Sequence, residues 1–358
     1  FVAIKRRVAK IKRRVIFAVA MLTIFAGCGN KRSQDDKVLF GEDKAPKETI
    51  TIHRFDKALF ESGNTPTEQY LLSIEKDFKP MFAANLSDKQ YMQVVKAFVQ
   101  DKQMQSVHKT VVSMYPDLKW LEDDLAKAMS KIRQIRPDST KTNIYTLILG
   151  PAEYSFAYQN RILVYPEYSA ISIDLYSMDS LSDNPYYKTM PEYLRASLKK
   201  ENIAPDYVRT YLQEITFRDI PLSFQNPEAT LLDCIIDDGK YSYAVAALLP
   251  EYGLNTIFRY TPAQQQWVEA NEYNIWTYII QNQLLYCKDR TKYLSLIAEG
   301  PSTKGINNSP ARIGNYIGYK IVCEYMDKNP ITLDSLFKID KSEQILKASG
   351  YKPNKTTK

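Results

Sequence analysis

The sequence has few of the side chains that most enzymes use as catalysts or metal ligands. It contains only two histidines, His53 and His108, in 358 residues. A His-Glu-x-x-His zinc site needs two imidazoles one helical turn apart, and these two lie far apart in the chain. No glycine-rich phosphate loop and no Gly-x-Ser-x-Gly turn is present. The sequence therefore gives little support to zinc, nucleotide or serine-hydrolase chemistry.

The sequence also lacks an apolar run long enough to anchor it in a membrane. Residues 15–25 carry no charge, but a membrane-spanning helix needs about 20 apolar residues. A leader with seven basic residues precedes this run, and Ala26-Gly27-Cys28 follows it. This order is typical of a secretory signal, and the residues before Cys28 resemble a lipobox. We therefore predict a lipoprotein signal peptide over residues 1–27 and a covalent diacylglycerol and acyl (palmitate-type) lipid on Cys28.

The chain that remains after cleavage has no excess of positive or negative charge. The net charge of +7 belongs to the precursor, since all seven leader charges are basic. Without them, 41 basic residues face 41 acidic ones. A nucleic-acid-binding domain would carry a basic surface, so no nucleic-acid partner is expected. Residues 28–48 are polar and charged, which predicts a flexible tether.

Three cysteines remain besides Cys28, namely Cys234, Cys287 and Cys323. Their number is odd, and they lack the paired short spacing of a zinc knuckle. The cell envelope is an oxidising compartment, so a disulfide between two of these cysteines is the alternative. Each cysteine lies in an apolar helical pattern, so we favour three buried thiols that pack as small apolar side chains.

The hydrophobic pattern predicts helices with a small sheet in the first half. Alternating or β-branched runs predict strands over residues 49–56, 143–149, 161–165 and 170–175. Helical spacing covers residues 66–78, 87–102 and 118–135, and dominates from residue 192 onward. The predicted fold class is α+β, predominantly α-helical, with a single globular domain over residues 49–358.

Four helices of the second half have readable ends. Asn226, Thr261 and Ser309 each precede a proline, a pattern typical of an N-cap followed by the first helical residue. These signals predict helices over residues 227–249 and 262–288 and from residue 310 to just before Pro330. The last helix covers residues 342–349, with Gly350 as its C-cap.

The C-terminal third carries the most specific residues. They are Asp237-Asp238-Gly239-Lys240-Tyr241, a tryptophan-containing stretch over residues 274–286, and Ser309-Pro310-Ala311-Arg312-Ile313-Gly314-Asn315-Tyr316-Ile317-Gly318. Together with the lipobox and Arg54-Phe55-Asp56, they make the chain resemble the gliding-motility lipoprotein GldB family. The resemblance implies a lipid-anchored envelope protein that is not an enzyme. It would act through contacts with envelope proteins of the motility and secretion machinery, at the outer rather than the inner membrane.

The same family is similar to zincin-type metallopeptidases, whose helix carries His-Glu-x-x-His. On that comparison, Asp237 and Asp238 take the places of the first His and the Glu, and Tyr241 that of the second His. Gln281 would lie near the third ligand, a carboxylate. Tyrosine and glutamine are poor zinc ligands, so the resemblance implies a zincin-like helical scaffold without metal or other cofactor.

The residues themselves allow a plainer interpretation, in which this helix face is solvated. Asp237 and Tyr241 lie one turn apart, and Lys240 is placed to neutralise Asp237. A degenerate pocket for a ligand or peptide is the alternative, with Arg312 among its residues. Arg312 falls in the first turn of its predicted helix, where the helix dipole disfavours a cation, so we expect a carboxylate partner or a ligand for it.

Gly314 and Gly318 lie one turn apart in the same predicted helix. Glycine in a helix interior costs about 1 kcal/mol relative to alanine. We expect close approach by a neighbouring helix to offset this cost, with a flat docking face for a partner as the alternative.

Three functions follow from the sequence. The first is a non-enzymatic envelope component that works through protein contacts. The second is a divergent zincin-like hydrolase that would use Asp237 and Asp238 as acid and base. Adjacent residues diverge by about 100° on a helix, which counts against that pair. The third is a peptide- or glycan-binding module that uses the tyrosine-rich surface.

Overall fold

A computed structural model describes residues 36–41, 47–139 and 141–355. The predicted signal peptide and the lipid-attachment residue Cys28 lie outside these ranges. The described residues group into one compact unit. Within the described residues, no helix combines the length and the apolar character needed to cross a bilayer.

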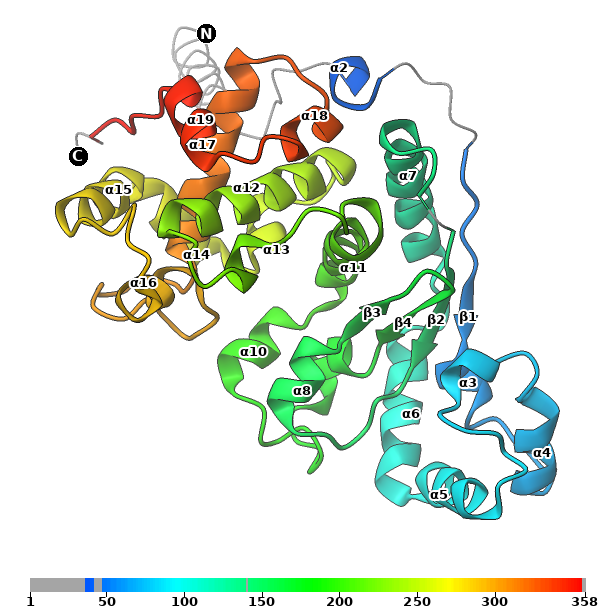
Figure 1. The fold of residues 1–358 in the computed structure, drawn as a ribbon. Helices are drawn as coiled ribbons and strands as arrows, with labels where there is room; N and C mark the ends of the chain where they lie inside the picture. Colours follow the sequence, from blue (N-terminus) through cyan, green and yellow to red (C-terminus); the bar gives the residue numbers. More distant parts are fainter. Residues whose placement is uncertain (1–35, 42–46, 140, 356–358) are drawn as a thin grey trace, which may run out of the picture. The chain divides into compact units, whose positions relative to one another are not determined.

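A four-stranded mixed sheet forms in the first half, as the sequence predicts. Its strands are β1 (Ile52–Arg54), β2 (Asn143–Leu147), β3 (Ile162–Val164) and β4 (Tyr168–Ser172). Their order is β1-β2-β4-β3, so β1 and β3 are the two edges. β1, β2 and β4 run parallel, and β3 pairs antiparallel with β4 through a tight hairpin. Figure 1 shows β3 as the end strand on the side of α11 and α10.

Helices make up most of the remaining structure, which confirms a predominantly helical α+β fold. Those before the sheet's second strand are α2 (Asp36–Phe40), α3 (Phe55–Ala58), α4 (Thr67–Ile74), α5 (Lys89–Gln100), α6 (Lys102–Met114) and α7 (Lys119–Ile135). α6 is missing from the sequence prediction, which ended one helix at residue 102. The chain turns at Asp101, whose carboxylate accepts hydrogen bonds from the Gln103 and Met104 amides and caps α6.

The predicted tether is wrong in its C-terminal part. Leu39 and Phe40 on α2 are buried, and α2 packs against α7. Lys131 lies over the Phe40 ring, 4.7 Å from its centroid. Glu48 is also buried and pairs with Arg133 at 3.1 Å. Leu39, Phe40 and Glu48 therefore attach part of the predicted tether to the folded domain. The polar composition of this segment does not reveal these contacts.

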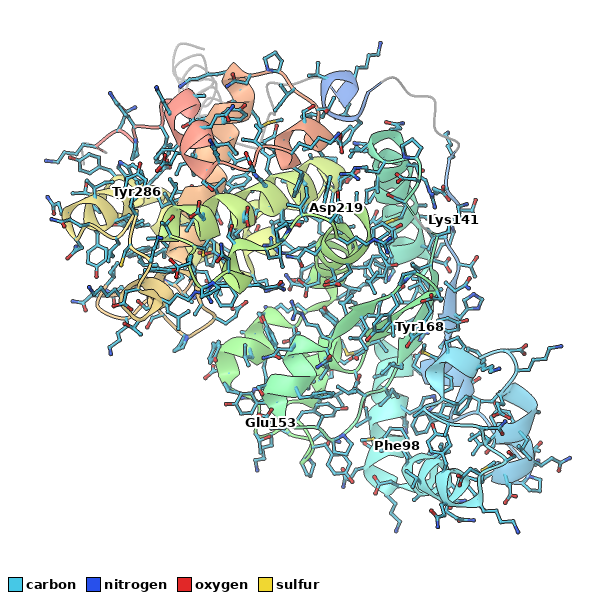
Figure 2. All side chains as sticks on the ribbon, in the orientation of Figure 1. Phe98, Lys141, Glu153, Tyr168, Asp219 and Tyr286 are labelled. Carbon is cyan, nitrogen blue, oxygen red and sulfur yellow. The ribbon has the colours of Figure 1, made fainter. Side chains whose placement is uncertain are left out.

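The second half contains α8 (Tyr154–Gln159), α9 (Met178–Leu181), α10 (Glu192–Ser197), α11 (Ile203–Tyr211), α12 (Leu231–Leu248), α13 (Leu254–Phe258), α14 (Pro262–Ala270), α15 (Glu272–Gln281), α16 (Arg290–Ile297), α17 (Ile313–Lys328), α18 (Leu333–Phe337) and α19 (Ser342–Ser349). Charged residues such as Lys141 and Asp219 lie on the outside (Figure 2). α12 runs through the interior of this half and is buried on nearly all sides.

Of the three helix starts predicted from a residue that precedes a proline, one is right and two are wrong. Thr261 caps α14 in a capping box with Gln264, with Pro262 at the first position. α12 begins four residues later than predicted, because Thr230 and Asp233 form a capping box and Asn226 does not cap the helix. α17 begins after Arg312 and not after Ser309, whose hydroxyl instead donates to the Ile306 carbonyl at 2.9 Å.

Close contact between α12 and α17 explains Gly239 and Gly318. A Cβ atom on Gly318 would lie 1.8 Å from the Ile235 carbonyl oxygen, and one on Gly239 would lie 2.5 Å from the Gly318 oxygen. The two backbones therefore touch, as the sequence predicts for Gly318. Gly314 instead faces α16, where an added Cβ would lie 3.0 Å from the Leu296 carbonyl oxygen.

The predicted solvated face of α12 is wrong. Lys240 is only 4% exposed, and its ammonium donates a 2.6 Å hydrogen bond to the Ile339 carbonyl. Tyr241 is 3% exposed. α17, α18 and α19 cover this side of α12. The sequence of α12 alone does not show that these later helices bury it.

Candidate ligand-binding cleft

Two adjoining cavities, of about 600 and 370 Å³, lie between β3, α11, α12 and the loop after α16. Arg209, Asp238, Glu299 and Asn315 line both, so we treat the two as one cleft. The larger cavity also contacts residues 161–165 of the edge strand β3 and its flanks. Tyr165 and Phe224, which are 44% and 53% exposed, contribute aromatic surface at the two cavities.

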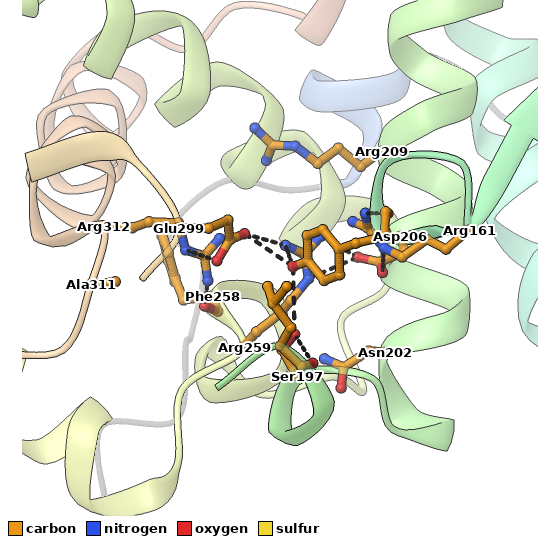
Figure 3. Close-up of polar contacts among 12 residues, drawn as sticks. Arg161, Ser197, Asn202, Asp206, Arg209, Phe258, Arg259, Glu299, Ala311 and Arg312 are labelled. Atoms are coloured by element: carbon orange, nitrogen blue, oxygen red, sulfur yellow. Dashed lines mark hydrogen bonds and ion pairs between the residues drawn. The ribbon is translucent and has the colours of Figure 1, made fainter. Parts of the chain in front are cut away.

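The larger cavity is lined by arginines that share buried carboxylates. Asp206 on α11 accepts hydrogen bonds from Arg161 at 2.8 Å, Arg259 at 2.5 Å and the Tyr176 hydroxyl at 2.8 Å. Figure 3 shows Arg161 and Arg259 converging on Asp206. Burial alone raises the pKa of Asp206, but the two guanidinium groups outweigh burial and lower it. Asp206 is therefore ionised and fixed in place.

Glu299 forms a second centre of the network. It accepts hydrogen bonds from Arg259 at 3.0 Å and from the Tyr158 hydroxyl at 3.1 Å, and its other oxygen lies 3.3 Å from Arg312 Nε. Its side chain is one-third exposed. Burial raises the pKa of Glu299, and the nearby arginines reverse this effect and lower it. Glu299 also lines a third cavity, of about 270 Å³, on the other side of the network.

Arg209 and Asp238 form a separate ion pair at the junction of the two cavities. Their nitrogen and oxygen atoms lie 2.5 Å apart, and Ser242 hydrogen-bonds to both side chains. In Figure 3, Arg209 lies apart from the Asp206 and Glu299 network. Each of the four guanidinium groups in the cleft thus has a carboxylate partner.

Two of the cleft arginines have an unusual backbone. Arg259 and Arg312 have φ angles of 55° and 58°, in the left-handed region that favours glycine. Arg312 directly precedes α17, and its guanidinium donates to the Phe258 carbonyl. The prediction of a carboxylate partner for Arg312 is confirmed by its contact with Glu299. Such backbone strain clusters at functional sites in proteins.

Two residues that line the smaller cavity carry buried polar atoms without partners. The Tyr241 hydroxyl and the Asn315 amide oxygen are buried, and neither has a hydrogen-bond partner among the described residues. Asp237 accepts a 2.7 Å hydrogen bond from the Ser223 amide, and burial raises the pKa of its carboxyl. Buried polar groups are nearly always paired in native proteins, so the Tyr241 hydroxyl and the Asn315 amide oxygen are exceptions among the lining residues of this cavity.

Four of the five residues that the sequence proposed for a pocket lie around this cleft. They are Asp237, Asp238, Tyr241 and Arg312. Gln281 does not line either cavity; it is exposed at the end of α15. The predicted helix over residues 262–288 is broken at Asn271, and α15 packs against α17, which removes Gln281 from α12.

Sequence reasoning missed most of the charged residues of the cleft, namely Arg161, Asp206, Arg209, Arg259 and Glu299. They come from different elements and have no common spacing. One local signal was available. Asp206 lies in α11 among Ile203, Ala204 and Tyr207, and a carboxylate on the apolar side of a helix needs a buried partner.

The three cysteines of the described chain are free thiols and form no disulfide with one another. Cys234 is buried and lines the smaller cavity, while Cys287 and Cys323 are partly buried. Among the residues that the structure describes, no group of three His, Cys, Asp or Glu side chains is arranged to hold a metal ion.

Comparison with known proteins gives one match. The model of a family described as gliding motility protein GldB matches residues 41–353. No curated protein and no solved structure matches the chain.

Proposed function

Because this chain belongs to the gliding motility protein GldB family, we propose that it is a lipid-anchored envelope protein that works by binding a partner in the arginine-lined cleft, without chemical turnover. The family places it with the gliding-motility lipoproteins of the cell envelope. The proposal adds the mode of action, the site, anchoring through Cys28 and a preference for the outer membrane.

The proposal of binding is supported by the pairing of the cleft's carboxylates with arginines and by the lowered pKa of two of them. Asp206, Asp238 and Glu299 are each held by at least one arginine. A general acid or base must exchange a proton with its substrate near neutral pH. Carboxylates whose pKa is lowered by arginines, as in Asp206 and Glu299, are poor acids at that pH and are already engaged as acceptors. Arginines that buried carboxylates hold in fixed positions suit recognition better than catalysis.

The test uses a gliding bacterium that lacks its own family member and expresses variants of this protein. Arg312→Gln removes one cation from the cleft, and we expect colony spreading to fall strongly while the protein stays at the membrane in normal amount. Arg218→Gln changes an exposed arginine outside the cleft and is the matched control. Normal spreading by Arg312→Gln would contradict a role for the cleft.

One observation favours the hydrolase alternative. Asp237 is a largely buried carboxyl with a raised pKa, which is the property that general acids share. A zincin-like hydrolase would also need a bound metal ion. Elemental analysis of the protein purified from membranes distinguishes the two functions: stoichiometric zinc together with peptide hydrolysis would replace the binding proposal, and neither is expected.

A further inference from the structure

The edge strand β3 carries hydrogen-bonding groups that face away from the sheet. In the hairpin, the Tyr165 amide donates to the Tyr168 carbonyl and the Ser172 amide donates to the Arg161 carbonyl. Paired residues of an antiparallel ladder alternate between bonded and non-bonded positions. Ile162 and Val164 therefore turn their N–H and C=O groups outward. Among the described residues, no hydrogen bond reaches these outward groups.

The opposite edge of the sheet is different. There the Ile52 amide at the start of β1 donates a 2.9 Å hydrogen bond to the Glu122 carboxylate. Proteins commonly protect sheet edges in such ways, because an open edge is a template for another strand. Among the described residues, no side chain pairs with the outer main-chain groups of β3 in this way, although α11 packs against the strand. β3 lines the cavity of about 600 Å³ together with Arg209 and Arg312.

Resting on the proposed function, we propose that the cleft binds an extended peptide segment, which adds to the outer edge of β3 as a fifth strand. The N–H and C=O groups of Ile162 and Val164 pair with its main chain. Addition of a strand to an exposed edge is a general mode of peptide recognition. Strand addition explains how a cleft that holds both arginines and carboxylates can bind a peptide. Pairing between main chains needs no net charge on the peptide.

The smaller cavity gives this segment a place for one side chain. It lies beside the strand site and shares Arg209 and Asn315 with it. Its wall includes Leu222 and the exposed ring of Phe224. An aromatic or medium-sized side chain of the peptide would fill this space and pack against these two residues.

The probe is a pool of random dodecapeptides displayed on phage, selected on the acylated protein purified from membranes in detergent. Selected peptides are then synthesised and N-methylated at one residue at a time. Strand addition predicts that methylation at alternate residues weakens binding by about tenfold or more, while methylation at the residues between them has little effect.

A substitution in β3 of the protein tests the same main-chain pairing without a change to the peptide. Val164→Pro removes an outward N–H but no ladder hydrogen bond, and proline is tolerated at such edge positions. We expect loss of peptide binding. Because the Val164 side chain is only 5% exposed, the change also lowers the unfolding temperature, so binding is measured well below the variant's unfolding midpoint. Thr51→Pro, just before β1 at the opposite edge, is the matched control and should bind normally. If Val164→Pro does not fold, the N-methyl scan decides alone.

Three results would overturn the inference: no peptide selected above background, equal effects of N-methylation at both sets of residues, or full binding by folded Val164→Pro. None of these would by itself overturn the proposed function. That proposal fails separately, if Arg312→Gln leaves colony spreading intact.

Discussion

At the scale of single residues, Asp206 is the centre of the cleft's charge network. It is 4% exposed and holds Arg161 and Arg259, which are themselves largely buried. Asp206→Asn leaves two buried cations without their shared anion. We expect a loss of about 3–5 kcal/mol in the free energy of unfolding at neutral pH, measured by urea denaturation. Asp219→Asn, at an exposed position, should change it by less than about 0.5 kcal/mol.

The pH dependence of this contribution has a definite sign. The pKa of Asp206 is lower in the folded protein than in the unfolded chain, where it is about 3.9. Asp206 therefore stabilises the fold above about pH 4, and this stabilisation is lost as the pH falls further. The difference between wild type and Asp206→Asn should shrink steadily below that pH. A difference that stays constant into acid would show that the arginines do not depend on the Asp206 charge.

Sequence reasoning at this scale was partly successful. It identified Arg312 as a cation in an unfavourable place and expected a partner, which is Glu299. It also selected Asp237, Asp238 and Tyr241, which lie in the cleft. It missed Arg161, Arg209 and Arg259, because an ion pair between distant elements leaves no mark on the local sequence of either partner.

At the scale of elements, the crossing of α12 and α17 depends on Gly318. Gly318→Ala would place a methyl group 1.8 Å from the Ile235 carbonyl oxygen, so the helices must separate. Overpacking of this kind costs about 1–3 kcal/mol or more, which exceeds the gain in helix propensity. We expect a lower thermal unfolding midpoint. Gly300→Ala is the control, since its added methyl would meet no atom closer than 3.5 Å.

The start of α12 gives a second prediction at this scale. Thr230 and Asp233 form the capping box, whereas Asn226 accepts a hydrogen bond from the Glu228 amide in a turn outside the helix. Thr230→Ala should lower the free energy of unfolding by about 1 kcal/mol. Asn226→Ala should have a smaller effect. A larger loss from Asn226→Ala would favour the earlier start that the Asn-Pro pair suggests.

The sequence predicted elements better than their boundaries and neighbours. All four predicted strands are present, although β4 begins two residues before its predicted start and ends three residues before its predicted end. The helix capped by Gly350 lies where its pattern indicates. The helix start at Ser309 and the continuous helix to residue 288 are wrong. Both errors come from local signals that tertiary contacts override, such as the pairing of Arg312 with Glu299 and the packing of α15 on α17.

At the scale of the whole molecule, the proposal that Cys28 carries a lipid anchor makes a prediction about where the protein is found in the cell. Cys28→Ser removes the thiol that carries the predicted lipid. We expect the protein to move from the membrane fraction to the soluble fraction of lysed cells, because no described helix is fit to span a bilayer. Retention of Cys28→Ser in the membrane fraction would mean that another feature of the chain holds it there.

The fold class was predictable from the sequence, since it follows from the order of hydrophobic patterns. The cleft was not, because β3, α11, α12 and the loop after α16 meet only through long-range packing. The zincin-like scaffold remains a prediction. The resemblance to zincins places Asp237, Asp238, Tyr241 and Gln281 at a former metal site. In the structure the first three lie in the cleft, and Gln281 lies at the exposed end of α15.

The most direct test of the central claim is photocrosslinking in intact gliding cells. A p-benzoylphenylalanine in place of Tyr165, which is exposed and lines the cleft, should give a discrete crosslinked product with an envelope protein. The same group in place of Tyr286, an exposed tyrosine beside α15 that lines neither cavity of the cleft (Figure 2), should not. Equal products from both positions, or none from Tyr165, would contradict a function that depends on binding in this cleft.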